Sequence, residues 1–376
     1  MSISIELFMV RAIFGNHHNS YEEVYMCGIV GIINTDRIKI DGSYIREAIR
    51  IQNERGNGLG GGFAAYGIYP GHKDNYAVHI MYQGGKHSEI IKTVEAFLEL
   101  RTKVHHSDEI PIFPTSIIPS GPYFKRYFVN PLKEQIPVGQ SEDDAMVDIV
   151  MAINTMGDAY VISSGKDMGV FKGVGFPEDI ADFFRIQDYK GYMWIAHNRF
   201  PTNTPGWWGG AHPFTILDKA VVHNGEITSY GTNKRWLEMF GYFCMLQTDT
   251  EVLSYIFDKL TRKDGLSVED ACFVMSPSLW EDIEYEKAEK KKLLRQLYGQ
   301  AIVNGPFGIV LTHSGGAIVL NDRNKLRPVV CARVGSTYYA SSEECSIRLL
   351  SPKVDALWSP RGGEAVIVDL AKEEVQ

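Results

Sequence analysis

CGIVGII, residues 27–33, alternates small and β-branched side chains. Such a run predicts a buried strand, and polar residues 34–36 supply the turn at its end. Apolar residues follow at helical spacing in residues 42–52, and a glycine-rich loop at residues 55–62 leads into a second strand at residues 63–69. The local order is therefore strand, helix, strand.

The middle of the chain is less regular. Residues 84–144 contain a helical stretch at residues 88–98 and then six prolines between positions 111 and 137, which predicts a mobile or family-specific insertion. Strand signals bounded by glycine or polar turns return at residues 160–163, 192–197 and 219–223.

The rest of the chain adds helices and then short strands. Thr248 and Asp249 are suitable caps for a predicted helix at residues 250–259. A charged and mostly solvated helix at residues 278–298 belongs to a helical excursion over residues 265–300, and residues 307–370 contain several short strands. Strands inside and helices outside indicate an α+β layered domain.

Composition narrows the class of protein. The 376 residues are 44% hydrophobic and carry a formal net charge of -8, with no basic cluster that would follow a nucleic-acid backbone. We therefore expect no nucleic acid as partner. No apolar run is long enough to span a bilayer, so we also expect no membrane as partner and a cytoplasmic location. The five cysteines are widely separated, and neither a phosphate-binding glycine loop nor a metal-binding histidine pair occurs. We expect no cofactor and no metal in this chain.

Four short motifs far apart in the sequence carry the functional signal. They are MCGIVG at residues 26–31, HNRFPT at 197–202, HNGE at 223–226 and TDTE at 248–251. In this order and spacing they closely resemble the glutaminase domain of class II glutamine amidotransferases. Residues 198–203 and 224–227 look most like the amidotransferase part of glutamate synthase, and LNDRNKLRP at 320–328 and ASSE at 340–343 are similar to the stretch that closes that domain. The resemblance implies the four-layer α/β/β/α sandwich of N-terminal-nucleophile hydrolases, with two mainly antiparallel sheets.

Amide hydrolysis through a covalent intermediate gives each motif a chemical role. An N-terminal Cys27 supplies both a thiol nucleophile and a base, because an α-amino group has an unperturbed pKa of roughly 7.7–8.0. The Asn224 side-chain amide and the Gly225 backbone N–H are suitable donors to the oxyanion of the tetrahedral intermediate.

The resemblance assigns the remaining motif residues to recognition of free glutamine. It implies that Arg199 holds the α-carboxylate as a planar fork and that Asp249 holds the α-ammonium. Thr202 would support this arrangement by hydrogen bonding, and His212 would lie in the pocket wall.

Each of these residues also has a simpler interpretation. Cys27 is compatible with a small buried hydrophobe, Asn224 and Gly225 with a hairpin turn, Asp249 with a helix cap and Arg199 with a surface cation. The loop at residues 55–62 ends without the Lys-Ser or Lys-Thr of a phosphate site, and predicts instead a close backbone approach beneath the nucleophile. The shared order of the four motifs favours the functional interpretation.

The α-amino base requires Cys27 to be the first residue of the active chain. Residues 1–26 are therefore expected to be a leader, a cleaved propeptide or a misassigned start, and residues 27–376 the amidotransferase domain. We favour a true start at Met26, because residues 22–24, EEV, can be encoded by a purine-rich ribosome-binding sequence.

The acceptor of the ammonia is expected on another chain. The leading hypothesis is a free-standing glutaminase subunit whose glutamate synthase-like partner carries FMN and an iron–sulfur cluster. Alternatives are an amidotransferase for a different acceptor, a glutamine-binding regulatory module without turnover, and a generic N-terminal-nucleophile acylase. A sensor does not need the thiol of Cys27, and an acylase does not need both charged residues, Arg199 and Asp249.

Overall fold

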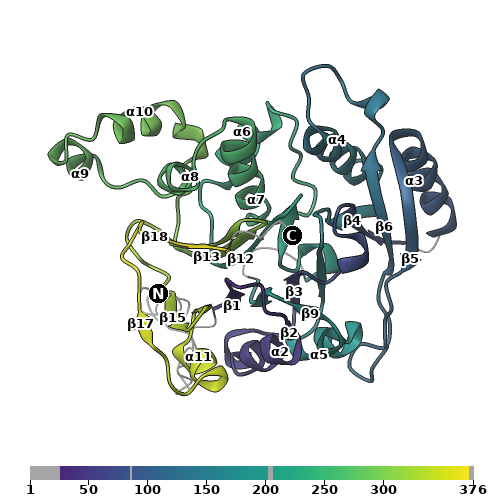
Figure 1. The fold of residues 1–376 in the computed structure, drawn as a ribbon, viewed down its shortest axis with the longest axis horizontal. Coiled ribbons are helices and arrows are strands. Elements are labelled where there is room, and N and C mark those ends of the chain that lie inside the picture. Colours follow the sequence, from purple (N-terminus) through teal and green to yellow (C-terminus); the bar gives the residue numbers. More distant parts are fainter. Residues whose placement is uncertain (1–25, 85–86, 202–205, 372–376) are drawn as a thin grey trace, which may run out of the picture.

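The computed structural model describes residues 26–84, 87–201 and 206–371, so Thr202 and all of the predicted leader except Met26 lie outside the described residues. Two antiparallel sheets stacked face to face form its centre (Figure 1). The larger sheet contains, in spatial order, β17 (Ala356–Trp358), β15 (Val330–Val334), β16 (Thr337–Ser341), β1 (Gly28–Asn34), β10 (Met193–Asn198), β3 (Gly61–Tyr66) and β8 (Met168–Gly173). The smaller sheet contains β11 (Phe214–Ile216), β12 (Lys219–Gly225), β13 (Phe307–His313), β14 (Gly316–Asn321) and β18 (Ala365–Asp369).

Strand β1 lies at the centre of this arrangement and is covered on both faces. Ile29 joins the core between the two sheets, whereas its neighbour Val30 packs with the helices on the opposite side. Because both faces are buried, the strand needs apolar or small residues at every position. Gly31 allows the sheets to approach, since a Cβ there would lie 3.0 Å from Cγ1 of Val310. The buried strand predicted at residues 27–33 is confirmed.

Helices cover the outer face of each sheet, which gives four layers in the order α, β, β, α (Figure 1). The larger sheet is covered by α2 (Ser43–Arg50), α5 (Pro177–Phe184) and α11 (Glu344–Leu350). The smaller sheet is covered by α7 (Glu251–Asp258) and α8 (Val268–Met275), with α6 (Tyr230–Glu238) packed against α7. The four-layer sandwich implied by the resemblance is confirmed.

A third sheet takes in two strands from residues 84–144, the segment predicted to be a mobile or family-specific insertion, and one strand from each side of it. It contains, in spatial order, β5 (Thr102–Glu109), β6 (Tyr123–Pro131), β4 (Tyr76–Tyr82) and β7 (Ala159–Ser163), and α3 (His87–Arg101) and α4 (Glu142–Asn154) pack against it. Strands β5 and β6 were not predicted from the sequence, and β5 in particular is an exposed edge strand with the sequence TKVHHSDE. Such a strand lacks the apolar alternation from which strands are predicted.

The charged helix predicted at residues 278–298 is two helices rather than one. They are α9 (Trp280–Tyr285) and α10 (Glu289–Leu297), and Lys287 between them adopts a left-handed conformation with φ of 52°. A left-handed residue cannot continue an α-helix, so the chain turns there.

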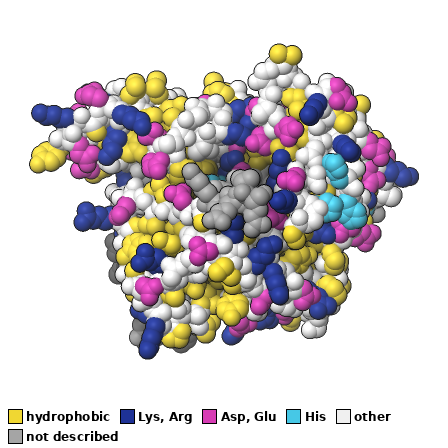
Figure 2. Space-filling view, in the orientation of Figure 1, with side chains coloured by type: hydrophobic (Ala, Val, Ile, Leu, Met, Phe, Trp, Pro, Cys, Tyr) yellow, Lys and Arg dark blue, Asp and Glu magenta, His cyan; other side chains and the backbone are white. Residues whose placement is uncertain are grey.

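The remaining described elements are short. They are the strand pair β2 (Ile40–Asp41) and β9 (Lys190–Gly191), the π-helical turn η6 (Lys259–Lys263) and the 3-10 turns η1 (Asn53–Arg55), η2 (Pro70–His72), η3 (Lys133–Gln135), η4 (Ile186–Asp188), η5 (Trp208–Gly210) and η7 (Gly299–Ala301). Within the described ranges, no helix combines the length and the apolar character needed to cross a membrane. Basic and acidic side chains are interspersed over the face seen in Figure 2.

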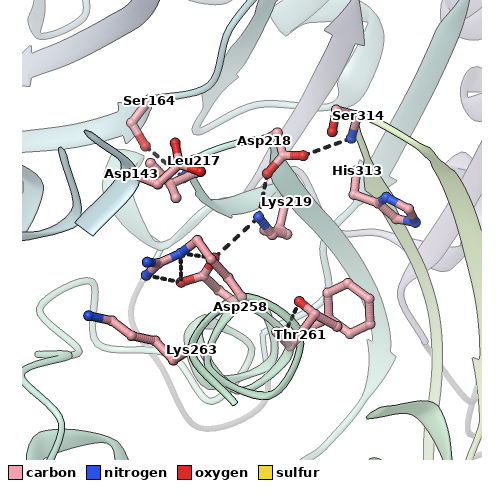
Figure 3. Close-up of polar contacts among 12 residues, drawn as sticks. Asp143, Ser164, Leu217, Asp218, Lys219, Asp258, Thr261, Lys263, His313 and Ser314 are labelled. Atoms are coloured by element: carbon pink, nitrogen blue, oxygen red, sulfur yellow. Dashed lines mark hydrogen bonds and ion pairs between the residues drawn. The ribbon is translucent and has the colours of Figure 1, made fainter. Parts of the chain in front are cut away.

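A network of ion pairs joins α7 to the hairpin between β11 and β12. The fully buried carboxylate of Asp258 accepts from Lys219 at 3.2 Å and from Arg262 at 2.8 Å. Figure 3 shows Lys219 between Asp258 and Asp218, whose carboxylate lies 2.5 Å from the same ammonium. Arg262 also pairs with Asp144 of α4, so the network ties the third sheet and its helices to the sandwich. A buried charge needs such partners to offset its loss of hydration.

Candidate active site

A cavity of about 210 Å³ opens where strands of both sheets end. Strand register brings its residues together: Gly28 pairs with Asn198, so Cys27 before β1 lies beside Arg199 after β10. The end of β12 contributes Gly225 from the smaller sheet. Five of the residues predicted from the sequence line this cavity: Cys27, Arg199, His212, Gly225 and Asp249.

Cys27 is held by backbone and side-chain groups of its neighbours. Its Sγ accepts a hydrogen bond from the Phe200 amide at 3.3 Å, and its carbonyl oxygen accepts from Nε of Arg55 at 3.2 Å. Burial raises the pKa of the thiol, and the Phe200 amide and the charge of Arg199 act in the opposite direction. The thiol is therefore protonated at neutral pH, and a base must take its proton before it can attack.

Arg199 is only 3% exposed, so the interpretation as a surface cation is wrong. Burial lowers the pKa of its guanidinium, while Cys27 and Asp249 raise it. A guanidinium nevertheless stays charged across the physiological range. The cavity therefore contains a fixed positive charge beside the thiol.

The glycine-rich loop at residues 55–62 packs tightly against the end of β10. A Cβ on Gly56 would lie 1.9 Å from Oδ1 of Asn198, and a Cβ on Gly60 would lie 2.8 Å from Cδ of Arg199. The predicted close approach of backbone is confirmed, although its contacts are to Asn198 and Arg199, which flank the nucleophile.

Asn224 and Gly225 end strand β12 and do not form a hairpin turn. Gly225 still pairs with Phe307 of β13, and its φ of 140° favours glycine. A Cβ there would lie 1.9 Å from the carbonyl oxygen of Pro306. Asn224 is 1% exposed, is not among the cavity-lining residues, and has an Oδ1 without a hydrogen-bond partner in the described part of the chain. The backbone of Gly225, rather than the Asn224 side chain, is thus the part of this pair that reaches the cavity.

Asp249 precedes α7 but does not cap it. The cap position is Thr250, without a side-chain capping bond, so the capping role predicted for Thr248 and Asp249 is wrong. The Asp249 carboxylate turns to the cavity wall instead, where Oδ2 accepts from the Ile227 amide at 2.7 Å. A carboxylate thus faces the cavity that also contains Arg199.

Three buried histidines form one side of the site. His212 stacks on His197 with 3.8 Å between ring centroids, and Nε2 of His197 bonds to the carbonyl oxygen of His223 at 2.9 Å. Burial lowers the pKa of all three imidazoles. His212 is in the pocket wall as predicted. His223 and Thr250 also line the cavity and had no predicted role, although both belong to the motifs HNGE and TDTE.

A buried lysine lies next to the site and was not predicted. Nζ of Lys172 donates to the carbonyl oxygens of Gly209 at 3.0 Å and Pro213 at 3.2 Å, on either side of His212. Burial lowers the pKa of Lys172 to about 7, and burial raises the pKa of nearby Glu251 to about 7.

In the described ranges, no group of three or more His, Cys, Asp or Glu side chains is placed to hold a metal ion.

Comparison with known proteins gives a consistent result. The family model for class II glutamine amidotransferases matches residues 144–376, more than half of the chain. An uncharacterized protein from Archaeoglobus fulgidus is 51% identical over 353 residues, which cover 93% of each chain. A putative glutamine amidotransferase from Methanothermobacter thermautotrophicus is 27% identical over 328 residues, 86% of this chain and 93% of that protein. Among solved structures, a glutamine phosphoribosylpyrophosphate amidotransferase from B. subtilis aligns with a TM-score of 0.48 and 16% identity over 91% of this chain and 47% of that one. The match of the family model to residues 144–376 shows that the chain belongs to the class II glutamine amidotransferases.

Proposed function

We propose that this chain is a free-standing glutaminase subunit that hydrolyses L-glutamine to glutamate and ammonia through a thioester on Cys27. The convergence of Cys27, Arg199, Gly225 and Asp249 on one cavity carries this proposal. These residues come from segments that are far apart in the sequence, and together they supply a nucleophile, a cation, a backbone donor and an anion. Free glutamine requires all four kinds of group.

The chemistry begins with proton transfer from the Cys27 thiol to its own α-amino group. The thiolate attacks the side-chain amide carbon of glutamine, and the Gly225 N–H, which lines the cavity, stabilises the resulting oxyanion. The amide nitrogen of the substrate then takes the proton from the α-ammonium group of Cys27 and departs as ammonia. The acyl group remains on Sγ as a thioester. Water then adds to the thioester and glutamate is released, restoring the thiol.

Two fixed charges select the substrate. In this proposal Arg199 holds the α-carboxylate and Asp249 the α-ammonium, with Thr202 assisting. A regulatory module that only senses glutamine would need these charges but not the thiol. The thiol of Cys27 beside the charges favours turnover over sensing.

The proposal requires that Cys27 be the first residue of the active protein. The nitrogen of Cys27 is an amide while Met26 precedes it, and an amide is not a base. A start at Met26 followed by methionine removal satisfies the requirement, as does cleavage of a propeptide.

The ammonia is proposed to pass to a glutamate synthase-like partner in the cytoplasm that carries FMN and an iron–sulfur cluster. Residues 198–203, 224–227 and 320–328 support this choice by their resemblance to the amidotransferase part of glutamate synthase. A synthase with a different acceptor is the alternative. Co-purification of the native protein with a flavoprotein that aminates 2-oxoglutarate supports the first choice, and a tight complex with an unrelated synthase refutes it.

Protein expressed from Met26 tests the glutaminase itself. Intact mass and N-terminal sequencing report the first residue, and a thiol-alkylating glutamine analogue is then added with and without excess glutamine. We expect one adduct on Cys27 that glutamine prevents, and ammonia release that is lost in Cys27→Ala. The exposed Cys345 is the matched control, because Cys345→Ala should change neither result. A chain that begins at Cys27 but neither takes the label nor releases ammonia would overturn the proposal.

A further inference from the structure

Thr250 joins three parts of the site through one hydroxyl group. The residue is fully buried, and its Oγ1 lies 2.8 Å from Nε2 of His212, 2.9 Å from Nδ1 of His223 and 3.3 Å from Oδ1 of Asp249. These contacts link the wall of the cavity, the end of β12 and the carboxylate at the start of α7. The hydroxyl is therefore well placed to set the position of Asp249.

The number of available protons decides the direction of these bonds. A hydroxyl donates one hydrogen bond and accepts two, and a carboxylate oxygen only accepts. Both imidazoles are neutral because burial lowers their pKa, so each has one N–H. All three contacts are satisfied when Thr250 donates to Asp249 and both His212 and His223 donate to Thr250.

The opposite ring nitrogens agree with this assignment. Nδ1 of His212 and Nε2 of His223 have no hydrogen-bond partner among the described residues. If either ring carried its proton on that nitrogen, a buried N–H would be left without an acceptor, which costs more than a bare nitrogen in the same place. The two histidines thus direct the single proton of Thr250 toward Asp249.

The carboxylate of Asp249 is then largely fixed by the protein. Oδ2 accepts from the Ile227 amide at 2.7 Å, and Oδ1 accepts from Thr248 at 3.4 Å and from Thr250 at 3.3 Å. A carboxylate has about four acceptor sites, so about one remains for a ligand in the cavity. A carboxylate held in this way is prepared for one ammonium group.

We propose that Thr250 is a positioning residue that orients Asp249 toward the α-ammonium of glutamine, and that His212 and His223 enforce its direction. This inference rests on the proposed glutaminase function. It predicts that loss of the hydroxyl reduces the preference for substrates with an α-ammonium and leaves the reaction at the amide carbon intact.

The test compares glutamine with 4-carbamoylbutanoate, which has the same amide and carboxylate but lacks the α-ammonium. We expect Thr250→Val to lower the kcat/KM for glutamine, relative to that for 4-carbamoylbutanoate, by about 10- to 100-fold, which is the usual effect of one hydrogen bond to a charged group. The kcat/KM for 4-carbamoylbutanoate should stay within about twofold. Thr250→Ser keeps the hydroxyl and should restore the ratio.

Thr261→Val is the matched control, because this hydroxyl on the same helical segment bonds only to the carbonyl oxygen of Phe257 among its described contacts. Thr250→Ala repeats the comparison without the branched side chain. An equal loss for both substrates, or unfolding of both the Val and the Ala variants, would mean that Thr250 only supports the fold and would overturn the inference. If the wild-type enzyme hydrolyses both substrates equally, the role of Asp249 and this inference are refuted, but the glutaminase function is not. If the chain that begins at Cys27 releases no ammonia from glutamine, the proposed function itself is refuted.

Discussion

The variant Gly225→Ala tests whether the backbone conformation at Gly225 is needed for the stability of the fold and for catalysis. A Cβ at a glycine with positive φ costs about 1–2 kcal/mol from local sterics alone. At Gly225 that Cβ would also lie 1.9 Å from the carbonyl oxygen of Pro306, which belongs to the connection preceding β13. Backbone must move to relieve this contact, and overpacking of this kind adds about 1–3 kcal/mol. We therefore expect a total destabilisation of about 2–5 kcal/mol.

Gly241→Ala is the matched control, since Gly241 has φ of 83° and a Cβ added there would meet no heavy atom of the described residues within 4 Å. We expect it to lose only the conformational term of about 1–2 kcal/mol and to keep its activity. Urea unfolding followed by tryptophan fluorescence measures the difference in stability between the two variants. Glutaminase activity measures the second effect, because a displaced Gly225 N–H should reduce kcat by about 10²- to 10³-fold. Equal unfolding midpoints and equal kcat values in the two variants would show that the conformation of Gly225 has neither role.

Three further substitutions test the charges in and around the site. Arg199→Lys should raise KM for glutamine by about 10-fold or more, because an ammonium cannot form the planar fork of a guanidinium; an unchanged KM in steady-state assays would contradict that contact. Burial lowers the pKa of Lys172 to about 7 in the folded protein, so between pH 7 and 10.5 the unfolded chain binds more protons than the folded one. The stability of the wild type therefore rises with pH in this window, and Lys172→Met should flatten that rise. Urea midpoints at pH 7 and 9.5 measure that slope, and equal slopes in the variant and the wild type refute the assignment. Asp258→Asn should destabilise the protein by about 3–5 kcal/mol by leaving Lys219 and Arg262 without their buried anion, and a thermal midpoint within about 1 °C of wild type would contradict this.

The central strands could be predicted from the sequence because burial on both faces leaves an unambiguous pattern. Residues 27–33 contain only small and apolar side chains, and a short apolar run at residues 220–222 marks β12, so the sequence predicts both strands to within a few residues. Strand β5 shows the opposite case. Its backbone pairs with β6 along its whole length, but most of its side chains are exposed and carry no apolar signal. Pairing of this kind depends on a neighbouring strand, which local sequence does not encode.

Some functional residues could likewise be predicted from the sequence, whereas others depend on contacts between distant segments. Cys27, Arg199, Gly225 and Asp249 stand in motifs whose order indicates their chemistry, and the structure brings them to one cavity. Thr250 is part of the same motif as Asp249, yet its importance comes from two histidines that approach from other segments. A hydroxyl with three partners is visible only after the chain has folded.

Lys172 is the most informative residue that sequence reasoning missed. It lies two and four residues after Val170 and Met168, both of which face the core between the sheets, so the alternation of β8 places the lysine on the same buried face. A lysine in that position is unfavourable unless its ammonium finds acceptors, and the carbonyl oxygens of Gly209 and Pro213 provide them. The hydrogen bonds of Lys172 therefore bind the segment that carries His212 to an edge strand of the larger sheet. An inward-facing lysine at the end of a buried strand is thus a signal that a loop crosses that end, and here the loop is the one that completes the active site.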